Sequence, residues 1–228
     1  MIYIFADTHA LQLEFWKMLS QIDRELTEED YIIVCGDFGY TMINKDDETF
    51  LNVLSRERYT VCFCDGNHEN FSLLNSLKVE EWNGGKVHKL RKNVIHLMRG
   101  QTYELDGKRM FTFGGGFSID RDKRVLNESY YLEEMPCREE YERGISSLDA
   151  VGYNVDYIIT HTAPSSVVQE IVKLTGRNDR NGEEELRDYL EQVRKRTAYK
   201  RWFFGHWHID KELENGIVAV YRKVHRVE

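Results

Sequence analysis

The residues best suited to chemistry are aspartates, histidines and an asparagine that gather in short polar clusters. In chain order the clusters are Asp7-Thr8-His9, Gly36-Asp37, Gly66-Asn67-His68-Glu69, His161 and Gly205-His206-Trp207-His208. Carboxylate and amide oxygens together with imidazole nitrogens are the ligands that a pair of divalent cations about 3.5–4 Å apart requires. Such a pair clamps a phosphoryl group and activates a water molecule. The clusters therefore predict a two-metal site that acts on phosphate.

Each cluster follows a short apolar run that is typical of a buried strand. The runs span residues 2–6, 31–35, 59–64, 157–160 and 202–204, with a further run at 110–113. Apolar stripes with helical spacing, at residues 11–22 and 186–193, lie between some of them. Strands that alternate with helices indicate a parallel α/β sheet, which places its ligands at the carboxyl ends of the strands. We therefore expect the clusters to converge.

The middle of the chain shows a different pattern. Shorter strand-like pieces at residues 87–90, 94–98 and 102–105 predict a second, more antiparallel sheet. Near the end, Asn215-Gly216 between two apolar pieces predicts a hairpin. No internal repeat, low-complexity tract or linker rich in proline and glycine divides the chain, so residues 1–228 are expected to form a single domain.

Residues 114–143 begin with three glycines and continue as a polar, aromatic and charged stretch. A loop of this length within a compact domain is usually functional, although a solvated excursion that ends in a short helix near residues 138–148 would have the same composition. Arg121 and Arg124 in this stretch are candidate ligands of a substrate phosphate, because a guanidinium suits bidentate contact with it. The alternative for both arginines is exposure to solvent.

Composition limits the classes of partner. The chain has 228 residues and a formal net charge of −8, so no global basic field is available to hold a long nucleic acid. An anionic substrate must be attracted locally, as bound cations would do. The four cysteines are expected to be reduced thiols. Without a signal-like start or an apolar run long enough to span a membrane, we expect a cytoplasmic protein with no membrane partner.

In order and over almost the whole chain, these clusters resemble the signature of the calcineurin-like metallophosphoesterases. The resemblance implies an α/β fold, a four-layer α/β/β/α sandwich of two mixed sheets flanked by helices. It also implies two ligand sets that share Asp37. The first set is Asp7, His9, Asp37 and His208, and the second is Asp37, Asn67, His161 and His206. Asn67 and His68 match residues that contact the substrate, and His68 matches the histidine that protonates the leaving oxygen.

Two positions depart from the family pattern. Ala10 replaces a glycine that often follows the first histidine, and Tyr40 replaces an aspartate three residues past the bridging aspartate. Gly39 and Tyr40 also differ from the Asp-Arg-Gly continuation of the phosphoprotein phosphatase branch, which argues against membership of that branch. The predicted metal ligands are all present.

The resulting hypothesis is a metal-dependent phosphoesterase in which a metal-bound hydroxide attacks a phosphate mono- or diester. The expected cofactors are two divalent ions, manganese first, with iron or zinc as alternatives. Two alternative functions are a non-catalytic binding or scaffold protein on this fold, which would be expected to lack some of the ligands or His68, and a nuclease, against which the net charge of −8 argues. Each motif residue also has a structural alternative, such as a helix cap for Asp7 or a turn for Asn67. The natural substrate and the oligomeric state stay open.

Overall fold

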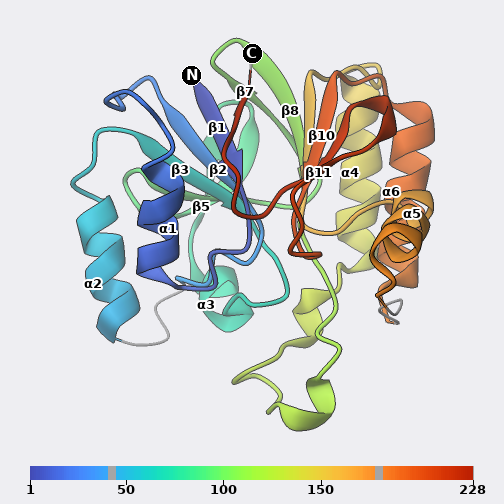
Figure 1. Cartoon of the computed structure of the whole chain (residues 1–228), viewed down its shortest axis with the longest axis horizontal. Coiled ribbons are helices and arrows are strands. Elements are labelled where there is room, and N and C mark those ends of the chain that lie inside the picture. The colour runs from blue at the N-terminus through green and yellow to red at the C-terminus, as the bar shows by residue number, and fades with distance from the viewer. Residues whose placement is uncertain (41–44, 178–181, 228) are drawn as a thin grey trace.

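Two mixed β-sheets face each other, with helices on both outer sides (Figure 1). The computed structural model describes residues 1–40, 45–177 and 182–227. The first sheet has the order β13 (His225–Val227), β1 (Ile2–Phe5), β2 (Tyr31–Cys35), β3 (Thr60–Cys64), β6 (Val94–Leu97), β5 (Gly85–Arg91), β4 (Val79–Trp82). The second has the order β11 (Lys211–Glu212), β12 (Ile217–Ala219), β10 (Arg201–Phe204), β9 (Tyr157–Thr160), β8 (Lys108–Phe113), β7 (Gln101–Leu105).

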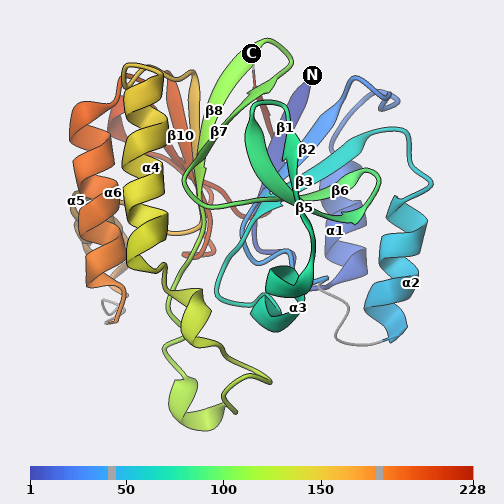
Figure 2. The ribbon, with the colours of Figure 1, turned by 180° about the vertical axis from the view of Figure 1, so that it is seen from behind.

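Helices from the two halves of the chain cover opposite sides of the sheet pair (Figures 1 and 2). Beside the first sheet lie α1 (Gln12–Leu19), α2 (Lys45–Leu54) and α3 (Phe71–Ser76). The second sheet is covered by α4 (Arg138–Ala150), α5 (Ser165–Thr175) and α6 (Glu184–Arg196). The predicted four-layer α/β/β/α arrangement is therefore confirmed.

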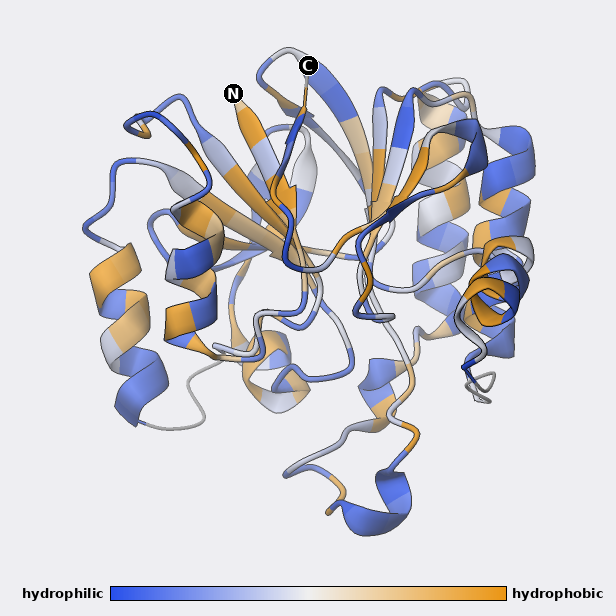
Figure 3. Ribbon diagram, viewed as in Figure 1, coloured by the Kyte–Doolittle hydropathy of each residue, from blue (hydrophilic) through white to orange (hydrophobic). Residues whose placement is uncertain are grey.

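Apolar side chains form three core clusters between these elements. In Figure 3 long stretches of the strands are coloured as hydrophobic. Strand β2 illustrates the cause. Ile33 and Cys35 point into the core between the sheets, whereas Ile32 and Val34 pack with Phe15 of α1. A strand that is buried on both faces needs a continuous apolar run, which is the pattern that predicted these strands.

The strands that precede the polar clusters end at the same edge of the molecule. Strands β1, β2 and β3 are parallel in the first sheet, and β9 and β10 are parallel in the second. The two sheets meet at this edge, because the backbone N–H of His206, after β10, donates to the carboxylate of Asp7, after β1, at 3.1 Å. The predicted convergence of the strand ends is present.

The prediction that the middle strands belong to the second sheet is wrong for β5 and β6. Strands β5 and β6 were predicted in a second sheet, but β6 pairs in parallel with β3 and β5 pairs antiparallel with β6, both in the first sheet. The reason is the length of the connection. Helix α3 and the hairpin of β4 and β5 provide enough chain between β3 and β6 for a parallel return. Of the three predicted middle strands, only β7 belongs to the second sheet.

The end of the chain follows its prediction more closely. Strands β11 and β12 pair antiparallel, and Asn215 and Gly216 between them have φ values of 57° and 73°. Asparagine and glycine tolerate this left-handed backbone, which is why the pair marks a turn.

Within the described residues, no helix is long and apolar enough to cross a membrane.

Residues 114–137 form an excursion between β8 and α4 that extends beyond the body of the molecule (Figures 1 and 2). It contains two short 3₁₀ helices, η1 (Arg121–Lys123) and η2 (Leu132–Glu134). The helix expected near residues 138–148 is α4, and it packs on the second sheet through Leu148. The expected helix is therefore present, and the side chains of residues 119–130 are all exposed or half-buried.

Two buried histidines, His88 and His96, lie in contact with each other beside Asp65. The Nδ1 atoms of His88 and His96 lie 3.1 Å apart, and Nε2 of His96 lies 3.1 Å from Oδ1 of Asp65. Facing Nδ1 atoms hold one proton between them. Burial, and then the charge of His96, lower the pKa of His88 to about 4.

This pair predicts a loss of stability in acid. The pKa of His88 in the folded chain lies below the unfolded value of 6.5, so the unfolded chain binds more protons between these values. The contribution is complete above pH 6.5 and is lost as the pH falls towards about 4. The urea concentration at the unfolding midpoint should therefore decrease as the pH is lowered from about 7 to about 5. The decrease should be smaller in His88→Asn, which keeps a hydrogen-bond acceptor near the position of Nδ1. An equal fall in both proteins would contradict this assignment.

Candidate metal centre

The polar clusters are held in an unusual backbone conformation. Asp7, His9, Asp37, His206 and His208 all have positive φ, between 48° and 65°. This conformation costs residues other than glycine roughly 1–3 kcal/mol each, and it persists where the surrounding structure fixes it. Here each strand-end loop turns sharply, so that its polar side chain points toward the space between the sheets.

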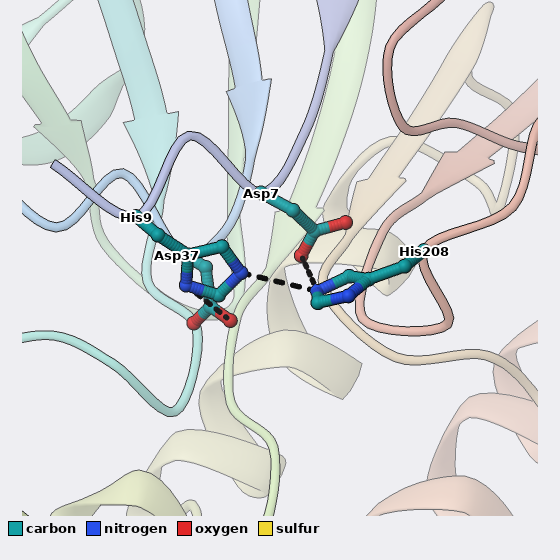
Figure 4. A group of neighbouring side chains, drawn as sticks. All are labelled: Asp7, His9, Asp37 and His208. Atoms are coloured by element: carbon teal, nitrogen blue, oxygen red, sulfur yellow. Dashed lines mark hydrogen bonds and ion pairs between the residues drawn. The ribbon is translucent and has the colours of Figure 1, made fainter. Parts of the chain in front are cut away.

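The first group of side chains consists of Asp7, His9, Asp37 and His208 (Figure 4). Nε2 of His9 lies 3.0 Å from Nε2 of His208, and Nδ1 of His9 lies 3.7 Å from Oδ2 of Asp37. Oδ1 of Asp7 lies 3.7 Å from Nε2 of His208. The carboxylates are buried, whereas the side chains of His9 and His208 are 26% and 38% exposed. This group therefore faces solvent through its histidines.

The second group consists of Asp37, His161 and His206, and it is fully buried. Nε2 of His161 lies 3.1 Å from Nδ1 of His206 and 3.5 Å from Oδ1 of Asp37. Asn67 adds an amide oxygen, because its Oδ1 lies 3.1 Å from Nε2 of His161. Asp37 belongs to both groups, so the two groups are adjacent.

Both groups have the chemistry of a cation site. In each group, every residue offers one atom that could bind a metal ion, and these atoms lie within 4.8 Å of one another. The atoms are carboxylate oxygens and imidazole nitrogens. Burial opposes the ionisation of Asp37, but the charges of the surrounding histidines, His161 first, outweigh it and hold the pKa of this carboxyl below its usual range. An ionised Asp37 among lone-pair donors fits divalent cations on both of its sides.

Hydrogen bonds outside the groups orient two of these side chains. Nδ1 of His161 lies 3.0 Å from the carbonyl oxygen of Cys35, which can only accept, so Nδ1 donates and Nε2 turns its lone pair to the group. Burial lowers the pKa of His161 to about 4, so the ring is neutral at pH 7. The amide nitrogen of Asn67 donates to Oγ of Ser118 at 3.1 Å, which turns Oδ1 of Asn67 to His161.

Two glycines allow the close approach. A Cβ atom on Gly36, whose φ is +80°, would overlap the ring of His161, and a Cβ atom on Gly66 would overlap the carboxylate of Asp37. Glu69 fixes the loop after Asp37, because its carboxylate accepts the backbone N–H groups of Phe38 at 2.8 Å and Gly39 at 3.1 Å. Glu69 therefore supports the loop that carries Asp37.

Glu183 is a site residue that sequence analysis missed. Its Oε2 lies 3.4 Å from Nε2 of His206, on the far side of the ring from His161. Its carboxylate also accepts from the hydroxyl of Thr162, the guanidinium of Arg187 and the backbone N–H of Phe117. A lone glutamate at the start of a helix has no pattern that marks it, so only the fold reveals this contact.

The remaining candidates differ in position. His68 lies beside the first group, with its ring centroid 5.1 Å from that of His9. Arg124 reaches His68, since its Nη1 lies 3.1 Å from Nδ1 of His68. Arg121 instead pairs with the buried carboxylate of Glu134 at 2.8 Å and lies over the ring of Phe117. The structure thus brings Arg124 to the site and ties Arg121 into the excursion.

Comparison with known proteins agrees with this fold. The family model described as calcineurin-like phosphoesterase matches residues 1–210, and the chain belongs to this family. Membership of this family makes the chain a phosphate-ester hydrolase and implies divalent metal ions, for which the two groups of side chains are possible ligands.

Among solved structures, the chain is similar to the crystal structure of a phosphopantetheinyl hydrolase from Mycobacterium tuberculosis. The TM-score is 0.51 at 16% identity, and the match covers 97% of this chain and 89% of the other. At this identity the similarity supports the fold. No curated protein sequence matches the chain.

The contact of Glu183 with His206 predicts a role in metal affinity. Carboxylates that accept from a ligating histidine fix its ring orientation and tautomer, and their loss typically costs about 10–100-fold in affinity. Glu183→Gln should weaken metal binding by this factor, as measured by competition with a chromogenic chelator. Glu185, an exposed residue two positions further along in the first turn of α6, provides the matched control, Glu185→Gln. Unchanged affinity in Glu183→Gln, with an unchanged urea midpoint, would contradict the role.

Proposed function

We propose that the chain hydrolyses a phosphate mono- or diester at a dinuclear metal centre. The observation that carries this proposal is the position of Asp37, whose buried carboxylate belongs to both groups of donor atoms. A carboxylate with one oxygen toward His9 and the other toward His161 has the geometry of a bridge. Manganese is the proposed metal, with iron and zinc as alternatives that accept the same ligands.

The proposed ligand sets follow the two groups. Asp7, His9, Asp37 and His208 hold one ion, and Asp37, Asn67, His161 and His206 hold the other. When bound, such ions neutralise charge on the phosphoryl oxygens and lower the pKa of a water molecule, so that a nucleophile exists at neutral pH. The protein contributes imidazole nitrogens and carboxylate oxygens that converge on the centre, and its strand-end loops hold them there.

The open side of the centre is the proposed entrance for substrate. His9 and His208 are partly exposed, whereas His161 is fully buried, so a phosphate ester approaches from the side of the first group. His68 also lies on this side and is partly exposed. In this position His68 is the proposed general acid that protonates the leaving oxygen, and Asn67 and Arg124 are the proposed contacts of the phosphoryl group. Arg121 remains a candidate for substrate binding only if the excursion rearranges.

Metal analysis combined with hydrolysis assays tests this proposal. The purified protein should bind close to two ions per chain, and its turnover of para-nitrophenyl phosphate or of the bis ester should stop with chelator and return with added manganese. The preferred ester would assign the substrate as a monoester or a diester. Failure to turn over either ester after reconstitution with manganese, iron or zinc would contradict the proposal for these substrate classes.

Two variants separate metal binding from catalysis in the same assay. Asp37→Asn should lose both ions, because each ion depends on this carboxylate. His68→Ala should keep both ions and lose about 10²- to 10⁴-fold in kcat, the typical contribution of a general acid. Retained metal and activity in Asp37→Asn would contradict the bridging role.

A further inference from the structure

A cavity of about 310 Å³ lies between parts of the chain that are far apart in sequence. One wall comes from α3 and the strands β5 and β6, and the other from the end of the excursion and the first turns of α4 (Figure 2 shows these elements from behind). Among the described residues that line it, none belongs to the two groups of metal ligands. Its volume falls at the lower end of the range typical of small-molecule sites, roughly 300–1,000 Å³. The cavity is therefore a candidate ligand site apart from the metal centre.

Much of the wall of this cavity is apolar. Phe71 and Leu74 of α3 contribute buried side chains, and Met98 and Met135 contribute half-buried ones. Apolar surface that a ligand removes from water favours binding. The thioether of methionine also makes favourable contacts with aromatic rings. The wall thus suits a compact apolar body, and an aromatic one in particular.

The buried charges of the cavity are already paired. Arg99 donates to Oδ2 of Asp65 at 2.5 and 2.8 Å and to Oε2 of Glu140 at 3.0 Å. The other two charged residues of the lining, the exposed Glu133 and the half-buried Arg143, have opposite signs. An anion would meet more carboxylates than guanidiniums, and a cation would compete with Arg99 for its carboxylates. Because an uncompensated charge is costly to take out of water, the cavity favours a neutral ligand.

One buried polar side chain of the lining keeps a ring nitrogen available. His88 is 4% exposed, and its Nδ1 lies 3.1 Å from Nδ1 of His96. The opposite nitrogen of the ring, Nε2, has no hydrogen-bond partner within the part of the chain that the structure describes. A polar atom in such surroundings costs free energy unless a ligand or water satisfies it. A hydroxyl group both donates and accepts, so it fits Nε2 whichever of the two rings carries the proton that they share.

We propose that this cavity binds a small neutral alcohol with an aromatic body, a phenol, through a hydrogen bond between its hydroxyl group and Nε2 of His88. The aromatic body packs against Phe71, Leu74 and the two methionines. Binding includes no covalent step and uses no metal ion, so this site goes beyond the proposed phosphoesterase function. An occupant contacts both α3 and the end of the excursion, and it joins the two halves of the molecule behind the metal centre.

Equilibrium dialysis with three related probes tests the class of ligand. 2-Naphthol should bind the full-length protein. Naphthalene, which lacks the hydroxyl group, should bind about 10-fold more weakly, as expected for the loss of one hydrogen bond to a buried group. The anion 2-naphthoate has a similar size and should also bind more weakly than 2-naphthol. Absence of 2-naphthol binding, or equally tight binding of 2-naphthoate, would overturn the proposal.

Two variants test the residues of the site with the same probes. His88→Asn keeps a polar group beside His96 but removes Nε2, so the advantage of 2-naphthol over naphthalene should disappear. Met135→Trp should fill the cavity and abolish binding. Its matched control is Leu132→Trp, a similar enlargement at a 65% exposed residue of the same excursion, which should bind 2-naphthol like the wild type. A retained advantage in His88→Asn, or retained binding in Met135→Trp, would contradict the assignment.

Nuclear magnetic resonance of the zinc-loaded protein, labelled with ¹³C in the methyl groups of methionine, locates the bound probe. Zinc is used because it has a filled d shell and does not broaden the signals. Addition of 2-naphthol should shift the signals of Met98 and Met135 and leave those of the other methionines in place. Asp37→Asn should show the same shifts, because the cavity lies outside the metal centre, so this result stands apart from the success or failure of the proposed hydrolysis. Shifts confined to other methionines would overturn the proposal.

Discussion

The crowding of lone-pair donors around one buried carboxylate is the constraint on which the rest of the structure depends. Two pairs of imidazole nitrogens face each other at 3.0–3.1 Å, and the carboxylate of Asp37 lies between the pairs. Such atoms cost free energy to bring together and to bury unless positive charge lies among them. The parallel strands, the left-handed turns and the close glycines all serve to assemble this group. Cations between the donors would stabilise it and would couple metal binding to folding.

Hydrogen bonds from residues outside the two groups orient the side chains of the groups. Groups that contact no cation themselves fix the direction of those that would: the carbonyl of Cys35 for His161, the hydroxyl of Ser118 for Asn67, and Glu183 for His206. Ser118 belongs to the excursion, whose Phe117 also donates to Glu183. The excursion therefore supports the buried group of ligands on one side and reaches His68 through Arg124 on the other.

Much of this arrangement follows from the sequence, for physical reasons that also mark the limits. Continuous apolar runs locate buried strands, and polar residues at their carboxyl ends must converge when the strands are parallel, as Asp7, Asp37 and Asn67 do. Sheet membership could not be predicted for residues 87–98, because pairing depends on long-range contacts and not on local pattern. Glu183 carried no signal, because its role arises from a contact with a residue in a different part of the chain. The path of the excursion, and hence the contrast between Arg121 and Arg124, also depends on tertiary contacts. The assignment of residues 1–228 to a single domain stays a prediction.

The most direct test of the central claim is an anomalous X-ray diffraction map from crystals grown with manganese. The account predicts two peaks about 3.5–4 Å apart, both within bonding distance of Asp37. Asp7, His9 and His208 should surround one peak, and Asn67, His161 and His206 the other. A single peak, or two peaks that Asp37 does not bridge, would contradict the account.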